Sequence, residues 1–290
     1  MVQIQKSFHH KQGALYLVPT PIGNLEDITI RAIQTLKDVD WIAAEDTRQT
    51  KKLTNYFEIS TPLISYHEHN KQTKGEWLLE ELRKEKKVAI VTDAGMPGIS
   101  DPGYELVRDS ISEGIPVIPL PGANAATTSL IASGLPTDHF YFFGFLPRKK
   151  KERQEELHNL KSLSCTLLFY ESPHRLKDAL EDLLQVLGDR KAVVARELTK
   201  RFEEFSRGNL SEQIAWAEEK PKGEFCILVE GSTKEEEAEN DLWWSALSMI
   251  DHVEHYMEEK DIMSKEAIKM VAKDRNLPKR EVYQAYHQIN

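Results

Sequence analysis

Short apolar runs alternate with amphipathic stretches along most of this chain, and this alternation restricts the fold more than any other feature. In the first half, five apolar runs are typical of buried strands, and a helical pattern follows each of them. The five runs are Ala14–Val18, Trp41–Ala44, Leu63–Tyr66, Val88–Val91 and Val117–Leu120. A repeated strand–helix order is typical of a mostly parallel sheet with helices on both faces. We therefore expect an α/β domain over residues 13–120.

The same alternation restarts after Pro121. An aromatic run, Phe140–Phe145, and an amphipathic Leu-rich helix are expected in this half. Further strands are expected at Cys165–Tyr170, Ala192–Ala195 and Phe225–Val229. These elements predict a second α/β domain over residues 121–232. Residues 233–290 are expected to form an acidic linker and short helices that resemble a helix-turn-helix, which gives the chain a small C-terminal helical extension.

Charge and targeting features limit the function classes. The net charge of −9 argues against a protein that coats nucleic acid non-specifically, although it leaves room for a local basic site. No apolar run is long enough to cross a bilayer, and no signal-peptide core is present. The two cysteines lie in apolar runs typical of buried thiols. We therefore expect a cytoplasmic protein with no membrane partner.

The loop between Val91 and Tyr104 is the strongest candidate for a binding site. It holds three glycines and two prolines directly after a strand. Open α/β sheets bind ligands at the carboxyl ends of their strands, and glycine lets the backbone approach a ligand closely. The chain contains neither a G-x-G-x-x-G fingerprint nor a phosphate loop, so the common nucleotide sites are excluded. The turn Pro19–Asn24, after the first strand, is expected at the same sheet edge.

Polar residues follow other strands at this edge. Glu45, Asp46 and Arg48 follow the second strand, where Asp46 is either a functional carboxylate or the cap of the next helix. His67 and His69 follow the third strand. The rest of the chain supplies no Cys/His pattern, which argues against a metal site, so we expect no metal.

The second half has three polar runs of its own. Arg148–Lys151 follows the aromatic run and is either a solvated helix start or a contact for the phosphate backbone of a nucleic acid. Tyr170–Arg175 and Arg196–Lys200 end two strands. No nucleophile elbow or Ser-His-Asp order is present, so acyl transfer is not favoured.

Together these segments resemble the tetrapyrrole-methylase-like superfamily. The resemblance rests on Pro19–Asn24, Ala44–Arg48, Tyr66–Asn70, Asp93–Gly103, Pro121–Ala126, Tyr170–Arg175, Arg196–Lys200 and Gly223–Gly231. Within the superfamily, the chain is most similar to the bacterial ribose 2′-O-methyltransferases of 16S ribosomal RNA. The resemblance implies two α/β domains with S-adenosylmethionine in the cleft between them, and methylation of a cytidine in the decoding centre. It also implies a homodimer that acts on 16S rRNA or the small ribosomal subunit.

The resemblance further implies the residues around the cofactor. Gly95, Met96 and Ile99 match the superfamily's cofactor loop. Met96 stands where many relatives carry Asp, so Asp93 or Asp101 is expected to replace that polar contact. The implied cofactor-binding residues are Pro21, Asp93, Gly95, Met96, Ile99, Asn124, Ala125, Tyr170, Glu171 and Leu198.

Methyl transfer to a ribose hydroxyl requires positioning of two reactants and a base near the attacking oxygen, and such a base contributes about 10²–10⁴-fold. The candidate bases are His67, Glu45, Asp46 and Glu197. The candidate phosphate-binding residues are Arg48, Arg148, Lys149, Lys150, Arg175 and Lys200. The tail is expected to add an RNA contact through Lys265, Lys269, Lys273, Lys279 and Arg280.

The residues leave three other functions open. One is a tetrapyrrole methyltransferase of the same superfamily, against which the basic run and the helical tail argue. The second is a non-catalytic RNA-binding protein, and the third is a methyltransferase that acts on a protein.

Overall fold

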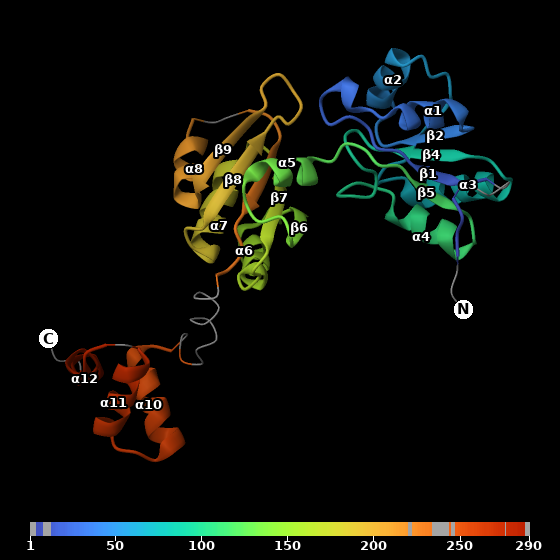
Figure 1. Cartoon of the computed structure of the whole chain (residues 1–290). Helices are drawn as coiled ribbons and strands as arrows, with labels where there is room; N and C mark the ends of the chain where they lie inside the picture. Colours follow the sequence, from blue (N-terminus) through green and yellow to red (C-terminus); the bar gives the residue numbers. More distant parts are fainter. Residues whose placement is uncertain are drawn as a thin grey trace. The chain divides into compact units, whose positions relative to one another are not determined.

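The computed structural model describes residues 4–7, 13–219, 222–233, 244, 247–275 and 277–287. The chain forms two compact units. The first comprises Met1–Lys161 and Cys165–Gly231, and the second comprises Ser162–Ser164 and Ser232–Asn290. The predicted fold class, two α/β sheets followed by C-terminal helices, is confirmed (Figure 1). The division at residues 120 and 232 stays a prediction, and the acidic linker predicted at Lys234–Asp241 lies outside the described residues.

The first sheet has five strands in the order β3-β2-β4-β1-β5, and every described pairing in it is parallel. The strands are β1 Leu15–Leu17, β2 Trp41–Ala44, β3 Leu63–Ser65, β4 Val88–Val91 and β5 Val117–Pro119. All five predicted strands are present, with ends that differ by at most one residue. Because the strands are parallel, the loops that follow them meet at one edge of the sheet.

Helices cover both faces of the first sheet because alternate strand residues point to opposite sides. The helices are η1 Leu25–Asp27, α1 Ile30–Asp38, α2 Thr47–Tyr56, α3 Lys71–Arg83 and α4 Tyr104–Ser112. Leu36 of α1 packs with Ile42 and Val91 on one face. Leu78 of α3 and Leu106 of α4 pack on the other. Each of the two cores therefore contains alternate residues of the strands.

The second sheet differs from the first because it is mixed, in the order β6-β7-β10-β8-β9. Its strands are β6 Phe140–Phe145, β7 Thr166–Glu171, β8 Lys191–Arg196, β9 Glu204–Asn209 and β10 Phe225–Val229. Only β6 and β7 pair in parallel, and the other pairings are antiparallel. Strand β9 is absent from the sequence prediction, since its residues Glu-Phe-Ser-Arg-Gly-Asn show no run of buried apolar residues at this sheet edge.

Four helices accompany the second sheet: α5 Ala125–Ser133, α6 Lys150–Leu160, α7 Leu176–Leu187 and α8 Leu210–Ala217. Ala126 and Leu130 of α5 pack against Leu168 and Leu228 on one face of the sheet. Helix α7 packs against its neighbours α6 and α8. The carboxyl end of β7 and the ends of β6 and β8 then carry the residues of the candidate site.

The second unit contains α10 Met249–Lys260, α11 Ser264–Asp274 and α12 Lys279–His287. A core of its own joins the three helices through Val253, Ile268, Val271 and Val282. The helix start that the sequence predicts at Leu242 lies outside the described residues, and α10 begins after its N-cap Ser248. The sequence favours Ser264 as the N-cap of α11, but Met263 holds that position and Ser264 is the first helical residue.

Candidate active site

The site is built on the loops that follow the parallel strands. We call the loop Thr92–Gly103, which follows β4, the Gly/Pro loop. A short antiparallel bridge joins it to the turn after β1. The Thr20 N–H donates to the Gly95 carbonyl at 2.9 Å, and the Gly95 N–H donates to the Thr20 carbonyl at 3.0 Å. The buried Thr20 hydroxyl donates to the Thr92 carbonyl at 3.0 Å. Gly95 has φ +85°, a conformation that favours glycine. These contacts fix the loop at the sheet edge.

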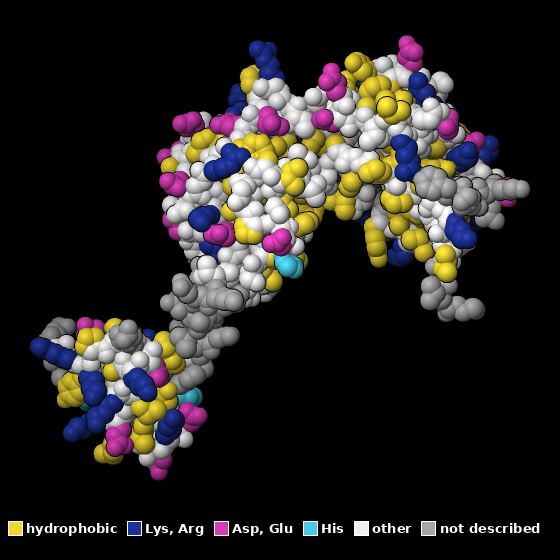
Figure 2. All heavy atoms as spheres, in the orientation of Figure 1, with side chains coloured by type: hydrophobic (Ala, Val, Ile, Leu, Met, Phe, Trp, Pro, Cys, Tyr) yellow, Lys and Arg dark blue, Asp and Glu magenta, His cyan; other side chains and the backbone are white. Residues whose placement is uncertain are grey.

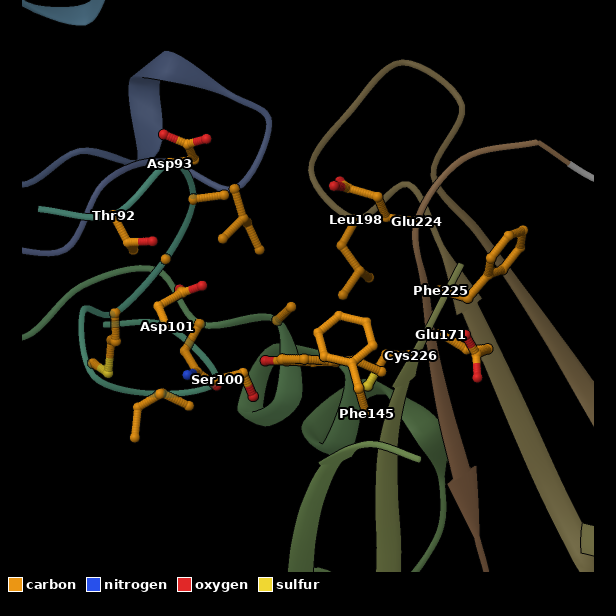
Figure 3. A pocket seen from close by; sticks show the side chains of 18 of the residues that line it. Thr92, Asp93, Ser100, Asp101, Phe145, Glu171, Leu198, Glu224, Phe225 and Cys226 are labelled. Atoms are coloured by element: carbon orange, nitrogen blue, oxygen red, sulfur yellow. The ribbon is translucent and has the colours of Figure 1, made fainter. Parts of the chain in front are cut away.

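A cavity of about 380 Å³ lies against this loop, a size within the usual range for small-molecule sites. Residues of both sheets line it. Figure 3 shows Thr92, Asp93 and Asp101 on one side of the cavity and Phe145 and Leu198 on the other. We call this cavity the cleft pocket.

The first sheet contributes carboxylates to the cleft pocket. The Thr92 hydroxyl donates its one proton to Glu45 Oε2 at 2.6 Å, and its side chain also lies within reach of Asp101. Burial raises the pKa of Asp101 to about 6, and the negative charges of Glu45 and Asp93 add to the shift. Burial and the charge of Glu45 also raise the pKa of Asp93. None of these three acids has a salt bridge with a described cation.

The carboxylates from the second sheet are compensated. Glu171 is buried, its Oε1 accepts from the Ser172 N–H at 2.8 Å, and its Oε2 lies 3.3 Å from Arg175 Nη2. Burial raises the pKa of Glu171, and the Ser172 and Arg175 groups oppose that shift. Glu224 pairs with Lys200 Nζ at 2.7 Å. The two sheets thus give the pocket acids of different electrostatic character.

Aromatic and apolar groups complete the second-sheet side. The Tyr170 ring contacts Phe142 and Phe145 edge-on, with centroids 4.9 and 5.6 Å apart. The Tyr170 hydroxyl accepts from the Ala126 N–H at 3.1 Å, and burial raises the pKa of Tyr170 to about 12. Burial also raises the pKa of the Cys226 thiol to about 12, so this pocket residue stays a neutral thiol.

The sequence profile of the Tetrapyrrole (Corrin/Porphyrin) Methylases matches residues 14–213, which is more than half of the chain. The chain belongs to the tetrapyrrole methylase family. This methylase is 59% identical over 290 residues to the Ribosomal RNA small subunit methyltransferase I of Halalkalibacterium halodurans, covering 99% of this chain and 100% of that protein. It is 58% identical to the protein of the same name from Bacillus subtilis, with 99% of each chain covered. The resemblance stated from the sequence is confirmed.

Solved methylase structures share this fold. The uroporphyrin-III C-methyltransferase of Thermus thermophilus, complexed with S-adenosylhomocysteine, aligns with a TM-score of 0.52 and 22% identity. The alignment covers 74% of this methylase and 97% of that chain. At this identity, the likeness shows the fold alone.

The structure gathers most of the predicted cofactor residues of this methylase around the cleft pocket. Those that line it are Asp93, Gly95, Met96, Ile99, Asn124, Ala125, Tyr170, Glu171 and Leu198. Pro21 lies outside the lining, although its neighbour Ile22 is part of it. Their individual contacts with a cofactor stay predictions.

Of the four predicted bases, Glu45 alone lines the cleft pocket. Asp46 caps α2 by accepting from the Arg48 N–H at 2.8 Å, and the Arg48 guanidinium lowers the pKa of Asp46 to about 2. His67 donates its backbone N–H to Asn70 Oδ1. Glu197 accepts from Lys200 Nζ at 2.9 Å.

The backbone around Glu197 is unusual. Glu197 and Thr199 have φ of +49° and +65°, and such left-handed residues often cluster at functional sites. Burial favours a higher pKa for Glu197, but hydrogen bonds from Lys200 and the Glu224 N–H lower it overall. Glu197 is therefore better suited to holding this loop than to accepting a proton.

Among the predicted phosphate-binding residues, only Lys200 lines the cleft pocket. Arg48, Lys149 and Lys150 are exposed. Arg175 donates to the carbonyls of Leu146 at 2.7 Å and Pro147 at 3.1 Å, so its guanidinium already has partners. Binding of RNA by these residues stays a prediction.

Sequence reasoning did not assign several pocket residues. They include Thr92, Ser100, Phe145, Glu224 and Cys226. Asp101 was named only as a replacement for a missing polar contact. The position of Thr92, Ser100 and Asp101 in the Gly/Pro loop could have identified these three as pocket residues. Phe145, Glu224 and Cys226 reach the pocket through the register of the second sheet, which no sequence motif reveals.

The structure also limits two other kinds of site. Among the described residues, no group of three or more His, Cys, Asp or Glu side chains is arranged to hold a metal ion. Within the same residues, no helix is both long and apolar enough to span a membrane.

Proposed function

We propose that this protein transfers a methyl group from S-adenosylmethionine to the ribose 2′-hydroxyl of a cytidine in the decoding centre of 16S rRNA. The observation that carries the proposal is the 58–59% identity, over nearly the whole chain, to two proteins named Ribosomal RNA small subunit methyltransferase I. The tetrapyrrole alternative is not favoured, because the tetrapyrrole methyltransferase described above shares only 22% identity.

The residues of the cleft pocket fit this cofactor. When bound, S-adenosylmethionine supplies a methyl group on a positively charged sulfur, which leaves with the electron pair of the broken carbon–sulfur bond. The acids of the first sheet, Glu45, Asp93 and Asp101, have no described salt-bridge partner and favour a cationic ligand. The loop from Gly95 to Ile99 and the apolar residue Leu198 provide the remaining surface. The predicted set, including Pro21 at its border, is proposed as the cofactor site.

We assign proton acceptance to the Asp101–Thr92–Glu45 group. The hydroxyl oxygen of the substrate forms the new carbon–oxygen bond, and its proton must pass to a base. A base works best when its pKa lies near the working pH, and Asp101, with a pKa raised to about 6, meets this condition better than an ordinary Asp. Thr92 links the two acids, because its hydroxyl donates to Glu45 and its side chain lies beside Asp101. Glu45 is the one residue of the predicted bases that joins this group.

RNA binding is proposed for the exposed cations outside the pocket. Arg48, Arg148, Lys149 and Lys150 lie on loops and helix starts of the α/β unit, and Lys200 lies at the pocket. Phosphate contacts of this kind position an RNA without reading its sequence. We further propose a cytoplasmic homodimer in which residues 13–120 and 121–232 act as the two domains around the cofactor.

Transfer of labelled methyl from S-adenosylmethionine to small ribosomal subunits, with mapping of the product nucleotide, tests the proposal. We expect one ribose 2′-O-methyl group on a single decoding-centre cytidine. Free 16S rRNA serves as the second substrate and shows whether the assembled subunit is required. Methylation of a porphyrinoid or a protein, with none on either RNA substrate, would contradict the proposal.

A further inference from the structure

Phe145 is a pocket residue that neither the family resemblance nor the proposed chemistry uses. It is the last residue of β6, lines the cleft pocket and is 54% exposed (Figure 3). A large aromatic side chain that is half exposed inside a concave site is well placed to contact a ligand. The edge of its ring meets the Tyr170 ring, with centroids 5.6 Å apart and planes at 62°.

The partner ring is itself immobilised. The Tyr170 hydroxyl is hydrogen-bonded to the Ala126 N–H, and the opposite contact of its ring is Phe142 at 4.9 Å. Tyr170 therefore supports Phe145 without covering it, which agrees with the exposure of Phe145.

Two guanidinium groups hold the backbone that follows Phe145. Arg175 Nη2 donates to the carbonyls of Leu146 and Pro147, as described above. Arg153 Nη1 donates to the carbonyls of Pro147 at 3.3 Å and Arg148 at 3.2 Å. Arg153 is 5% exposed and is fixed by Asp182 Oδ2 at 2.6 Å. A ring on such a restrained backbone loses little conformational entropy on binding.

The surroundings of Phe145 have the character of a nucleic-acid site. The basic run Arg148–Lys151 begins three residues later, and its lysines are exposed. The ion pairs of Lys149 and Lys151 are surface pairs, which hold weakly, whereas Lys150 lies 3.6 Å from the buried Asp182. On the other side, a Cβ on Gly144 would lie 2.9 Å from Ser100 Oγ, so β6 closely approaches the Gly/Pro loop. Aromatic rings beside a basic backbone groove are the usual means of holding unpaired bases.

We infer that Phe145 is the stacking platform for the base of the methylated nucleotide, which leaves its helical stack and enters the cleft pocket. This inference rests on the proposed function and adds how the target nucleotide is held. A stacked nucleotide displays its ribose hydroxyl only at the shallow surface of the minor groove, whereas a displaced nucleotide can carry that hydroxyl into a concave site, and displaced bases are held by stacking. The acids of the first sheet then face the cofactor and the hydroxyl, while the ring of Phe145 faces the base.

The test compares Phe145→Leu, Phe145→Trp and the matched control Phe140→Leu. Phe140 lies on the same strand, is 45% exposed and does not line the cleft pocket. For each variant, calorimetry measures S-adenosylmethionine affinity, and methyl transfer to small subunits gives kcat/KM. We expect Phe145→Leu to lower kcat/KM by about 5- to 150-fold, the usual worth of base–aromatic stacking, with cofactor affinity unchanged. Phe140→Leu should stay near wild type, and Phe145→Trp, which keeps a ring for stacking, should lose less activity than Phe145→Leu.

A second substrate shows whether the ring acts on the target base itself. Small subunits reconstituted with an abasic target nucleotide should be poor substrates for the wild type, and Phe145→Leu should lower their rate no further, because both changes remove the same contact. Loss of cofactor affinity in Phe145→Leu would overturn the inference, since the ring would then hold the cofactor. Equal losses for Phe140→Leu, or additive losses with the abasic substrate, would also overturn it. A wild type that leaves subunits unmethylated would instead disprove the proposed function, and the inference with it.

Discussion

The two sheets supply the cleft pocket with acids that differ in their ion pairs. On the second sheet, Glu171 lies beside Arg175 and Glu224 is paired with Lys200. On the first sheet, the pocket acids have no described salt-bridge partner, and these are Glu45, Asp93 and Asp101. A partly buried carboxylate without an ion pair is unfavourable in its ionised form, and such carboxylates are concentrated at functional sites. From this difference we infer that the first sheet handles positive charge and the proton, while the second holds flat and apolar groups.

The largest expected effect on methyl transfer comes from neutralising an acid on the first-sheet side of the cleft pocket. Asp101→Asn keeps the shape and removes the proton acceptor, so we expect methyl transfer to fall by about 10²–10⁴-fold. The same change should raise the melting temperature at pH 7, because it removes a charge whose burial is unfavourable. Activity assays and calorimetry measure the two effects. Asp109→Asn, at a half-buried position of α4 outside the cleft pocket, is the control and should change activity little. Unchanged transfer in Asp101→Asn would remove this residue as the base.

The next effect tests how the second-sheet side is supported. Asp182 is 1% exposed and compensates the buried Arg153, which holds the loop after Phe145. Asp182→Ala leaves that guanidinium buried without its main partner, so we expect a loss of roughly 3 kcal/mol in the free energy of unfolding. Denaturant titration measures it. Asp178→Ala, at an exposed position in the first turn of the same helix, should cost far less. Equal losses in both variants would show that the buried pair has no special weight.

The contrast between the sheets also explains how far the sequence could predict this molecule. Parallel strands such as Val88–Val91 are buried on both faces and form continuous apolar runs, so their positions were predictable. The Gly/Pro loop was likewise predictable as a pocket wall from its glycines and prolines, and its residues line the cleft pocket. Strand β9 was missed because it lies at the edge of an antiparallel pairing and carries polar residues. The sequence could not decide whether Asp46 is a helix cap or a catalytic base. The structure decides it, because the backbone N–H and the guanidinium of Arg48 both donate to the Asp46 carboxylate.

A third prediction concerns pH and sharpens the role of the unpaired acids. The pKa of Asp101 is raised to about 6, so the group is mostly protonated below that pH and ionised above it. If its ionised form accepts the proton, kcat/KM should fall about tenfold per pH unit below pH 6 and level off above it. Stability should show the opposite sign, because a raised folded-state pKa stabilises the protein at low pH and loses that contribution as pH rises through 6. Stopped assays from pH 5 to 8 measure kcat/KM as a function of pH. In Asp101→Asn, the fall of kcat/KM below pH 6 should be absent.

The smallest expected effect comes from changes in the C-terminal helical unit, none of whose described residues lines the cleft pocket. Lys265, Lys269 and Lys273 recur every four residues on α11, opposite its buried face, and all three are exposed. Figure 2 shows Lys and Arg side chains gathered on this unit. If each lysine contacts one RNA phosphate, changing all three to Gln should reduce the slope of log affinity against log salt by roughly 2 to 3. Filter binding of small subunits at several salt concentrations measures the slope.

Acidic residues of the neighbouring helix provide the control for that variant. Glu254→Gln with Glu258→Gln on α10 alters the charge of the same unit without touching the lysines, and the salt slope should stay as in the wild type. Methyl transfer at low salt should change little in either variant, because the pocket residues all belong to the α/β unit. An unchanged slope in the lysine variant would show that RNA contacts are confined to the α/β unit. The helical unit would then need another role, one that its basic stripe does not reveal.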